Sequence, residues 1–206
     1  MENLEKYSVI IPTLWKSDRT KQLLLDLEAS EYVDEIIIID NTLTYVSDDS
    51  IGKIRTISFG ENIYVNPAWN CGVSLAKNEH IAICNDDIIF NPNIFGLIAY
   101  NNVDGIIGQC SNNFNKPHNN NPKITPMNQP RPFGWGTLLL TQKKYWIPIP
   151  EQLKIWYGDD FLINKNPCKK WILGNFEIST IMSTTSDLPE FHPIKHNDGL
   201  EWVKLI

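Results

Sequence analysis

The stretch His80-Ile-Ala-Ile-Cys-Asn-Asp-Asp-Ile-Ile-Phe90 decides how this chain can fold. Its apolar run from Ile81 to Cys84 is typical of a buried strand, and two carboxylates, Asp86 and Asp87, follow closely. Acids at the end of a buried strand cost free energy unless a cation meets them. A hard divalent metal ion prefers oxygen ligands, and one held by few carboxylates completes its shell with substrate phosphates. The stretch therefore indicates either a metal site for a phosphorylated or nucleotide-activated substrate, or a polar turn with two solvated acids.

Strands and helices alternate on both sides of this stretch through the first half of the chain. Short apolar runs bounded by polar residues suit strands covered on both faces, whereas apolar residues three or four positions apart indicate helices. The alternation predicts an α/β fold with a mostly parallel, right-handed, Rossmann-like sheet and helices on both faces. Strands are expected at 7–12, 36–39, 54–59, 81–84 and 105–109, and helices at 20–30, 66–77 and 92–99.

Polar side chains follow three of the expected strands, at the point where each strand ends. These are Pro12-Thr13, Asp40-Asn41 and Asp86-Asp87. In an open α/β sheet, ligands bind beyond the carboxyl ends of the strands. We therefore expect the three pairs to converge on one edge of the sheet and to form a binding site there.

The second half of the chain has a different character. Residues 111–132 are rich in Asn and Pro and show no periodicity, which predicts a long loop of a kind that is often functional. Strands are expected at 137–141 and 176–182, and a helix opens at Tyr157-Gly-Asp-Asp-Phe161. No repeat and no clear linker divides the sequence, so residues 1–206 are expected to form a single domain.

The composition narrows the classes of function. A net charge of -6 without a basic stripe argues against nucleic acid as a partner. No apolar run approaches the roughly 18 residues of a transmembrane segment, and the polar, acidic N-terminus does not resemble a signal peptide. Four cysteines that lie far apart disfavour a disulfide scaffold and a zinc site, and they suit a reducing cytosol. We therefore expect a soluble, cytoplasmic protein.

Three common enzyme signatures are absent from the sequence. There is no GxGxxG after the first strand and no GxxxxGK(S/T), which argues against a dinucleotide-binding fold and a P-loop enzyme. The GxSxG elbow of a Ser-His-Asp hydrolase is missing as well.

Five motifs follow one another along the chain in a recognisable order. They are Ser8-Val-Ile-Ile-Pro-Thr13, Ile37-Ile-Ile-Asp-Asn41, Asn70-Cys-Gly-Val-Ser-Leu-Ala-Lys-Asn78, Asn85-Asp-Asp87, and Trp135-Gly-Thr-Leu-Leu-Leu-Thr-Gln-Lys-Lys-Tyr145 with Trp156-Tyr-Gly-Asp-Asp-Phe-Leu162 after it. In this order they resemble the family 2 type of glycosyltransferase, which has the GT-A fold of nucleotide-diphospho-sugar transferases. The resemblance covers about residues 7–165. It implies a nucleotide-sugar-binding half at 1–110 and an acceptor-side half at 111–206.

The resemblance implies a donor site at the strand ends. Pro12 and Thr13 would hold the nucleoside of a nucleotide-sugar, and Asp86 would face its ribose. Asp40 would accept a hydrogen bond from the base, although a solvated acid that caps a strand end is the other interpretation. Asn70 would lie over the base or ribose, although an exposed polar residue on a helix is the other interpretation.

The resemblance also implies a metal ion. Asp87 would bind Mn2+ or Mg2+ on the diphosphate of the donor, where a Lewis acid stabilises the departing nucleoside diphosphate. Asn85 stands where the first acid of the family's DxD motif is often found, and it adds no charge. Many GT-A enzymes add a histidine ligand near the C-terminus, for which His196 and His192 are the candidates, and exposed histidines are the other interpretation.

Asp159 and Asp160 form a second acid pair. By the resemblance, Asp160 acts as the general base that takes the proton of an acceptor hydroxyl, and Asp159 replaces a glutamate. Two acids that favour the positive end of a helix are the other interpretation. Arg131 could clamp a phosphate, and Trp135 could stack on a sugar or belong to the core.

The expected function is the metal-dependent, inverting transfer of a sugar from a nucleotide-diphosphate donor, with UDP favoured, to a hydroxyl of a glycan or other acceptor. The loop at 111–132 would close over the substrates. One alternative is a sugar-nucleotide pyrophosphorylase, against which the glycine-free segment Leu14-Trp-Lys-Ser-Asp-Arg19 counts. Another is a non-catalytic module of the same fold that binds a glycan or nucleotide. The chain could also be one domain of a larger polypeptide.

Overall fold

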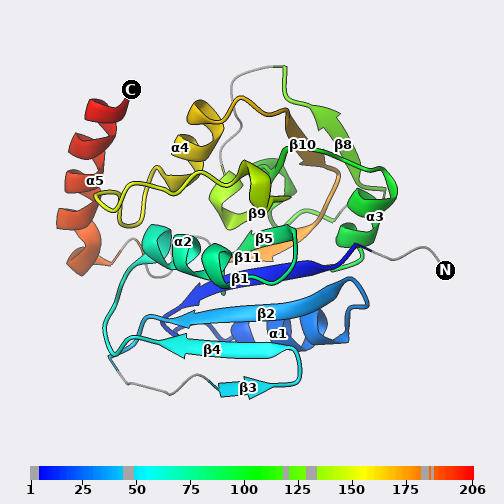
Figure 1. Cartoon of the computed structure of the whole chain (residues 1–206), viewed down its shortest axis with the longest axis horizontal. Helices are drawn as coiled ribbons and strands as arrows, with labels where there is room; N and C mark the ends of the chain where they lie inside the picture. The colour runs from blue at the N-terminus through cyan, green and yellow to red at the C-terminus, as the bar shows by residue number, and fades with distance from the viewer. Residues whose placement is uncertain (1–4, 44–48, 118–120, 129–133, 182–185, 187) are drawn as a thin grey trace.

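A large central sheet organises the molecule, and helices cover both of its faces (Figure 1). The computed structural model describes residues 5–43, 49–117, 121–128, 134–181, 186 and 188–206. Within these residues the sheet has nine strands. From edge to edge they are β3 (Asp49–Ile51), β4 (Ile54–Ser58), β2 (Val33–Asp40), β1 (Tyr7–Thr13), β5 (His80–Cys84), β9 (Leu138–Gln142), β7 (Ile106–Gln109), β10 (Lys170–Gly174) and β8 (Lys123–Pro126).

Strands β4, β2, β1 and β5 are mutually parallel and form the part of the sheet predicted from the alternating pattern. Thr13 at the end of β1 lies opposite Asp40 at the end of β2, which in turn lies opposite Ser58 of β4. The carboxyl ends therefore meet at one edge, as expected. The apolar runs of β1 and β2 are buried because helices cover both faces there.

Antiparallel strands, most of them from the second half, make the sheet mixed rather than mostly parallel. β9 is antiparallel to both β5 and β7, and β8 is antiparallel to β10, while β10 and β7 are parallel. β9 begins at Leu138, opposite Cys84 at the end of β5, so it runs in the opposite direction to β5 and β7.

Two hydrophobic clusters separate the faces of the sheet. α1 (Thr20–Ala29) and α3 (Ile94–Tyr100) contribute to one cluster, together with a small antiparallel pair formed by β6 (Ile88–Phe90) and β11 (Ile178–Thr180). The other cluster receives α2 (Val65–Leu75), α4 (Gly158–Lys165) and α5 (His192–Leu205). In Figure 1, α2 lies in front of the sheet and α1 behind it. The prediction of helices on both faces is confirmed.

The described parts of the expected loop at 111–132 contain structure that the sequence did not indicate. Residues 111–113 form a 3-10 turn, and β8 adds an edge strand whose last residue, Pro126, suits an edge. The predicted strand at 176–182 is shorter, at Ile178–Thr180. Among the described helices, none combines the length and apolar character that crossing a bilayer requires.

Candidate active site

A cavity of about 500 Å³ opens at the carboxyl ends of β1 and β5. Both acid pairs of the sequence line it: Asp86 and Asp87 from the β5 end, and Asp159 and Asp160 from the first turn of α4. The N-terminal end of α2, Phe191 and Lys195 of α5 contribute to its wall. Carboxylates far apart in the sequence therefore share one cavity.

Asp86 is fixed by its neighbours on the β1–α1 connection. The Thr13 hydroxyl donates to Asp86 Oδ2 at 2.5 Å, and the backbone N–H of Trp15 donates to Thr13 Oγ1 at 2.8 Å. The hydroxyl of Thr20, at the start of α1, donates to the backbone carbonyl of Asp86 at 3.0 Å. Burial raises the pKa of the Asp86 carboxyl, and the Thr13 hydrogen bond partly opposes that rise.

Asp87 is partly buried, and too few groups of the described chain surround it to stabilise its negative charge. Burial, and then the neighbouring charge of Asp86, raise the pKa of Asp87 to about 6, and Arg19 counteracts only part of this. Within the described residues, Asp87 Oδ1 is buried and has no hydrogen-bond partner. A buried acceptor without a donor costs free energy, and a cation bound there would remove that cost. No group of three or more His, Cys, Asp or Glu side chains gathers into a metal site among these residues.

The second acid pair depends on a tightly built turn before α4. Tyr157 adopts the left-handed conformation, with φ of 63°, so that α4 begins at Gly158 and directs Asp159 and Asp160 into the cavity. The carboxylate of Asp159 accepts a hydrogen bond from the backbone N–H of Gly136 at 3.0 Å. Strain of this kind at a non-glycine residue is common at functional sites.

Gly158 is required because α2 approaches it closely. A Cβ at this position would lie 2.1 Å from Asn66 Oδ1. The fully buried Asn66 also donates from Nδ2 to the carbonyls of Leu153 and Trp156, at 3.3 and 3.1 Å. α2 thereby holds the segment that leads into the second acid pair.

The structure brings most, but not all, of the predicted residues together. Pro12 and Thr13 line the cavity. Asp40 is buried at the end of β2, where its Oδ1 accepts the N–H of Thr42 at 2.9 Å, and its neighbour Asn41 lines the cavity instead. Asp40 thus caps the turn after β2, but it is buried and not the solvated acid of the alternative interpretation.

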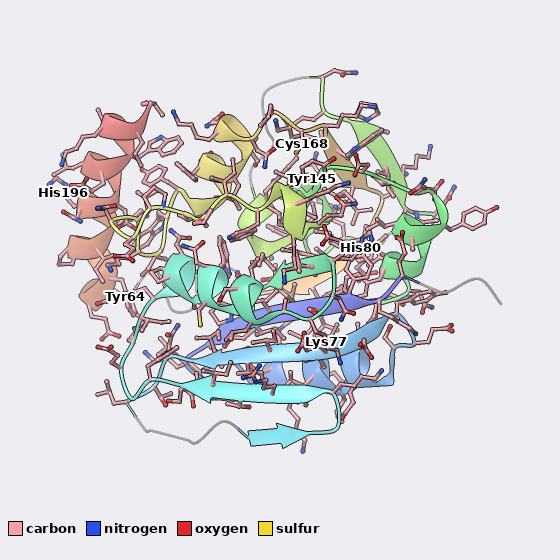
Figure 2. The ribbon with its side chains drawn as sticks, viewed as in Figure 1. Tyr64, Lys77, His80, Tyr145, Cys168 and His196 are labelled. Atoms are coloured by element: carbon pink, nitrogen blue, oxygen red, sulfur yellow. The ribbon has the colours of Figure 1, made fainter. Side chains whose placement is uncertain are left out.

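Asn70 and His196 lie away from this cavity. The Asn70 amide holds the segment 146–149: it donates to the Ile149 carbonyl at 2.8 Å and accepts from Trp146 Nε1 and the Ile149 N–H at 3.1 and 3.0 Å. His196 is exposed on α5, at the outer edge of the molecule (Figure 2). Neither residue is among the described cavity residues, so we do not assign either a contact with donor or metal.

Trp135 belongs to the core and does not face the cavity. It is completely buried, and its ring lies so close to Gly108 that a Cβ there would be 1.9 Å from Trp135 Cδ2. Its neighbours Gly134 and Gly136 line the cavity instead. Arg131, the other candidate from this region, lies outside the described residues.

Several cavity residues were not assigned a role from the sequence, although Trp156 belongs to one of the quoted motifs. Tyr64 precedes α2 with φ of 68°, and Trp156 precedes the Tyr-Gly-Asp-Asp turn. Lys195 reaches the cavity from α5, an element that the sequence motifs do not include. Their positions depend on tertiary contacts, and only the unusual backbone at Tyr64 marks one of them locally.

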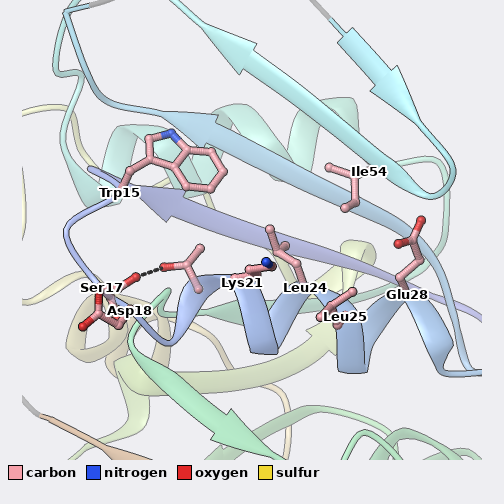
Figure 3. Close-up of a pocket in the computed structure, with 9 residues that line it drawn as sticks. Trp15, Ser17, Asp18, Lys21, Leu24, Leu25, Glu28 and Ile54 are labelled. Atoms are coloured by element: carbon pink, nitrogen blue, oxygen red, sulfur yellow. Dashed lines mark hydrogen bonds between the residues drawn. The ribbon is translucent and has the colours of Figure 1, made fainter.

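A second cavity, of about 470 Å³, lies along α1 on the other side of the sheet from α2 (Figure 3). Its lining includes Trp15, Lys21, Leu24 and Ile54, and neither acid pair reaches it. The cavity with the two acid pairs is therefore the candidate active site.

Comparison with known proteins agrees with this geometry. The family model described as Glycosyl transferase family 2 matches residues 8–164. Among solved structures, S. aureus TarS 1-349 is similar with a TM-score of 0.62 and 14% identity, over 85% of this chain and 60% of that chain. GalNAc-T7 with UDP, GalNAc and Mn2+ is similar with a TM-score of 0.61 and 12% identity, over 87% of this chain and 44% of that chain. No curated protein matches the sequence.

The mixed sheet, with acids gathered at the carboxyl ends of its strands, defines a protein of the GT-A glycosyltransferase fold. Because the family match covers most of its length, the chain belongs to glycosyl transferase family 2. The fold class expected from the sequence is confirmed. The chain covers 60% or less of the TarS 1-349 and GalNAc-T7 chains.

Proposed function

We propose that this chain transfers a sugar from a nucleotide-diphosphate donor to a hydroxyl of a glycan or other acceptor, with inversion at the anomeric carbon. The observation that carries the proposal is the single cavity that contains both acid pairs. One pair lies where a donor diphosphate would bind, and the other lies where an acceptor would need a base. UDP is favoured as the nucleotide, because TarS has been crystallised with UDP and GalNAc-T7 with UDP, GalNAc and Mn2+.

The donor nucleoside would lie against the end of β1 and the adjoining end of β2. Pro12 and Asn41 line that part of the cavity. The hydroxyl of Thr13 is engaged with Asp86, so its role is to orient the carboxylate that faces the ribose. Asp40 supports the site through the turn that it caps at Thr42.

A divalent ion, Mn2+ or Mg2+, suits the first acid pair. The buried, unpartnered Oδ1 of Asp87 is an oxygen ligand of the kind such ions prefer. Asp87 would hold the ion, with the donor diphosphate supplying further oxygens. When bound, the ion supplies Lewis-acid stabilisation of the negative charge on the leaving group.

Asp160 is the proposed catalytic base. Its carboxylate takes the proton of the acceptor hydroxyl while the acceptor oxygen forms a bond to the anomeric carbon. The bond from that carbon to the donor phosphate oxygen breaks in the same step, and its electron pair leaves with the nucleoside diphosphate. Asp159 is held by the Gly136 N–H, and it orients the first turn of α4 that carries Asp160.

Thermal unfolding in the presence of UDP-, GDP- and TDP-sugars with Mn2+ tests the donor class. A ligand that binds only the folded state raises the unfolding temperature. We expect a rise with at least one donor, and a smaller rise when EDTA replaces Mn2+. The absence of a shift with every donor contradicts the proposed function.

The Asp160→Asn variant tests the base. We expect transfer to fall by on the order of 10²–10⁴-fold, while the thermal shift caused by the donor stays at the wild-type value. Asp26→Asn, on the outer part of α1, is the matched control and should transfer at the wild-type rate. Near-normal transfer by Asp160→Asn would remove this residue from the mechanism.

A further inference from the structure

α5 contributes to the cavity although it lies outside the region that the family accounts for. The family match ends at residue 164, and α5 begins at His192. Phe191, directly before the helix, and Lys195 within it both line the cavity. Any role of these side chains has to be found in the geometry of this chain.

A buried carboxylate fixes α5 to the segment in front of α4. Asp198 is completely buried, and its two oxygens accept hydrogen bonds from three successive backbone N–H groups, those of residues 154–156, at 3.0, 2.8 and 2.9 Å. Hydrogen bonds to an ionised acceptor are the strong ones. The rings of Tyr157 and Trp202 stack beside this contact, with centroids 5.5 Å apart and planes 7° from parallel. The register of α5 against the cavity is therefore fixed.

This register places the ammonium group of Lys195 at the cavity. Lys195 lies one helical turn before Asp198, and its Nζ lies 5.5 Å from the centroid of the Trp156 ring. An aromatic ring attracts a cation weakly and restricts where it can go. Within the described part of the chain, the ammonium forms no salt bridge with a carboxylate. It is therefore available to an anion in the cavity.

The charge of the cavity favours such a cation. Four aspartates line it, and Lys195 is the one Lys or Arg among its described lining residues. A nucleoside diphosphate is itself an anion, and like charges at close range inside a protein repel strongly. One divalent ion at Asp87 offsets only part of that repulsion.

We propose that Lys195 binds the diphosphate of the nucleotide-sugar donor and keeps this contact with the nucleoside diphosphate that departs. The inference rests on the proposed function, because it requires a diphosphate in the cavity. α5 is thereby a part of the donor site, and Asp198 is the positioning residue that holds it there.

Equilibrium titration of the full chain tests the contact. The probes are UDP, GDP and TDP, each compared with its uncharged nucleoside, at low ionic strength and with Mn2+ present. Lys195→Gln keeps the length and the stem of the side chain but removes its charge. For the diphosphate that wild type binds, we expect the Kd to rise roughly tenfold, as for loss of a charge-assisted contact, and the Kd of the nucleoside to stay unchanged.

Two further variants make the result specific. Lys195→Arg keeps the charge and should restore most of the diphosphate affinity. Lys204→Gln removes a charge from the same helix, in an exposed pair with Glu201, and should leave both dissociation constants unchanged. A change of similar size in Lys204→Gln would mean that net charge, and not a contact, controls affinity, which overturns the inference.

The remaining outcomes separate this inference from the proposed function. If Lys195→Gln binds the diphosphate as tightly as wild type, the inference is wrong and the proposed function stands. If the variant loses affinity for the nucleoside to the same extent, Lys195 shapes the cavity and does not bind phosphate, which also overturns the inference. If wild type binds none of the three diphosphates, the proposed function itself fails, and the inference fails with it.

Discussion

At the scale of single residues, Asp87 is a carboxylate whose partly buried position reduces the stability of the protein but suits the binding of a cation. Burial and the charge of Asp86 raise the pKa of Asp87 to about 6, and Oδ1 has no donor among the described residues. Binding sites commonly retain residues that reduce stability. Removal of the charge should therefore stabilise the unliganded protein while it weakens the binding of a divalent ion.

We expect Asp87→Asn to be more stable than wild type at neutral pH. Because the folded pKa is raised, the folded protein binds more protons than the unfolded chain between roughly pH 4 and pH 6. The stabilising contribution of protonated Asp87 is complete below this window and is lost as the pH rises through it. Urea unfolding of both proteins at pH 5 and pH 7.5 should show a larger advantage of the variant at pH 7.5.

The control for this prediction is Asp18→Asn, which removes an exposed acid outside the cavity. It should show no comparable gain in stability at either pH. An Asp87→Asn protein that is no more stable than wild type at pH 7.5 would mean that Asp87 is better solvated than its burial implies.

Gly158 offers a second test at the level of single residues. Gly158→Ala adds a Cβ that would lie 2.1 Å from Asn66 Oδ1, so we expect a loss of about 1–3 kcal/mol in the free energy of unfolding. Gly199→Ala is the matched control, because its nearest atom would be Tyr157 Oη at 3.7 Å within a helix. It should raise stability slightly, through lower chain entropy in the unfolded state. Equal effects of the two variants would contradict the close packing of α2 against α4.

At the scale of elements, α5 is fixed by one buried carboxylate that acts on three backbone groups. Asp198→Asn keeps the shape but removes the charge, and it turns an amide N–H2 toward donors. We expect a loss of about 2 kcal/mol or more in unfolding free energy. Faster hydrogen exchange at the N–H groups of residues 154–156 would locate that effect. Glu201→Gln, in an exposed pair with Lys204, should change stability by less than about 1 kcal/mol.

The elements that the sequence predicted well are those whose reasons are local. The apolar runs of β1, β2 and β5 and the acids that follow them are visible without any tertiary information, and the carboxyl-end rule brings their ends together. β8 was not predicted because it is short, it lacks an apolar pattern, and its last residue is Pro126. The contacts of Asn70 were not predictable either, since they depend on how the segment 146–149 returns to α2. Lys195 belongs to the cavity only because Asp198 fixes its helix.

At the scale of the whole molecule, the two halves expected at 1–110 and 111–206 are interleaved in one sheet. β9 from the second half lies between β5 and β7 of the first half. Both hydrophobic clusters also draw residues from each half. This interleaving fits the single domain expected from the sequence, and the two halves are not separate layers of the structure.

We expect residues 1–206 to unfold in a single cooperative transition, and the fragment 1–110 not to form a stable fold. The fragment lacks β9, which is the partner of β5 on one side and of β7 on the other. Circular dichroism and fluorescence during denaturant unfolding should give coincident curves for the full chain. A cooperative transition of the isolated fragment would show that the first half has an independent core.

The place of β9 also has a consequence for synthesis on the ribosome. β5 is complete at Cys84 and can pair with β1, but β9, its neighbour on the other side, begins only at Leu138. At about 5–20 residues per second, translation leaves the edge of β5 unpaired for several seconds. An unpaired, apolar strand edge is a template for association with other chains. The nascent chain is thus expected to need protection, by a chaperone or by slow collapse around β1 and β2, until Leu138 to Gln142 emerges.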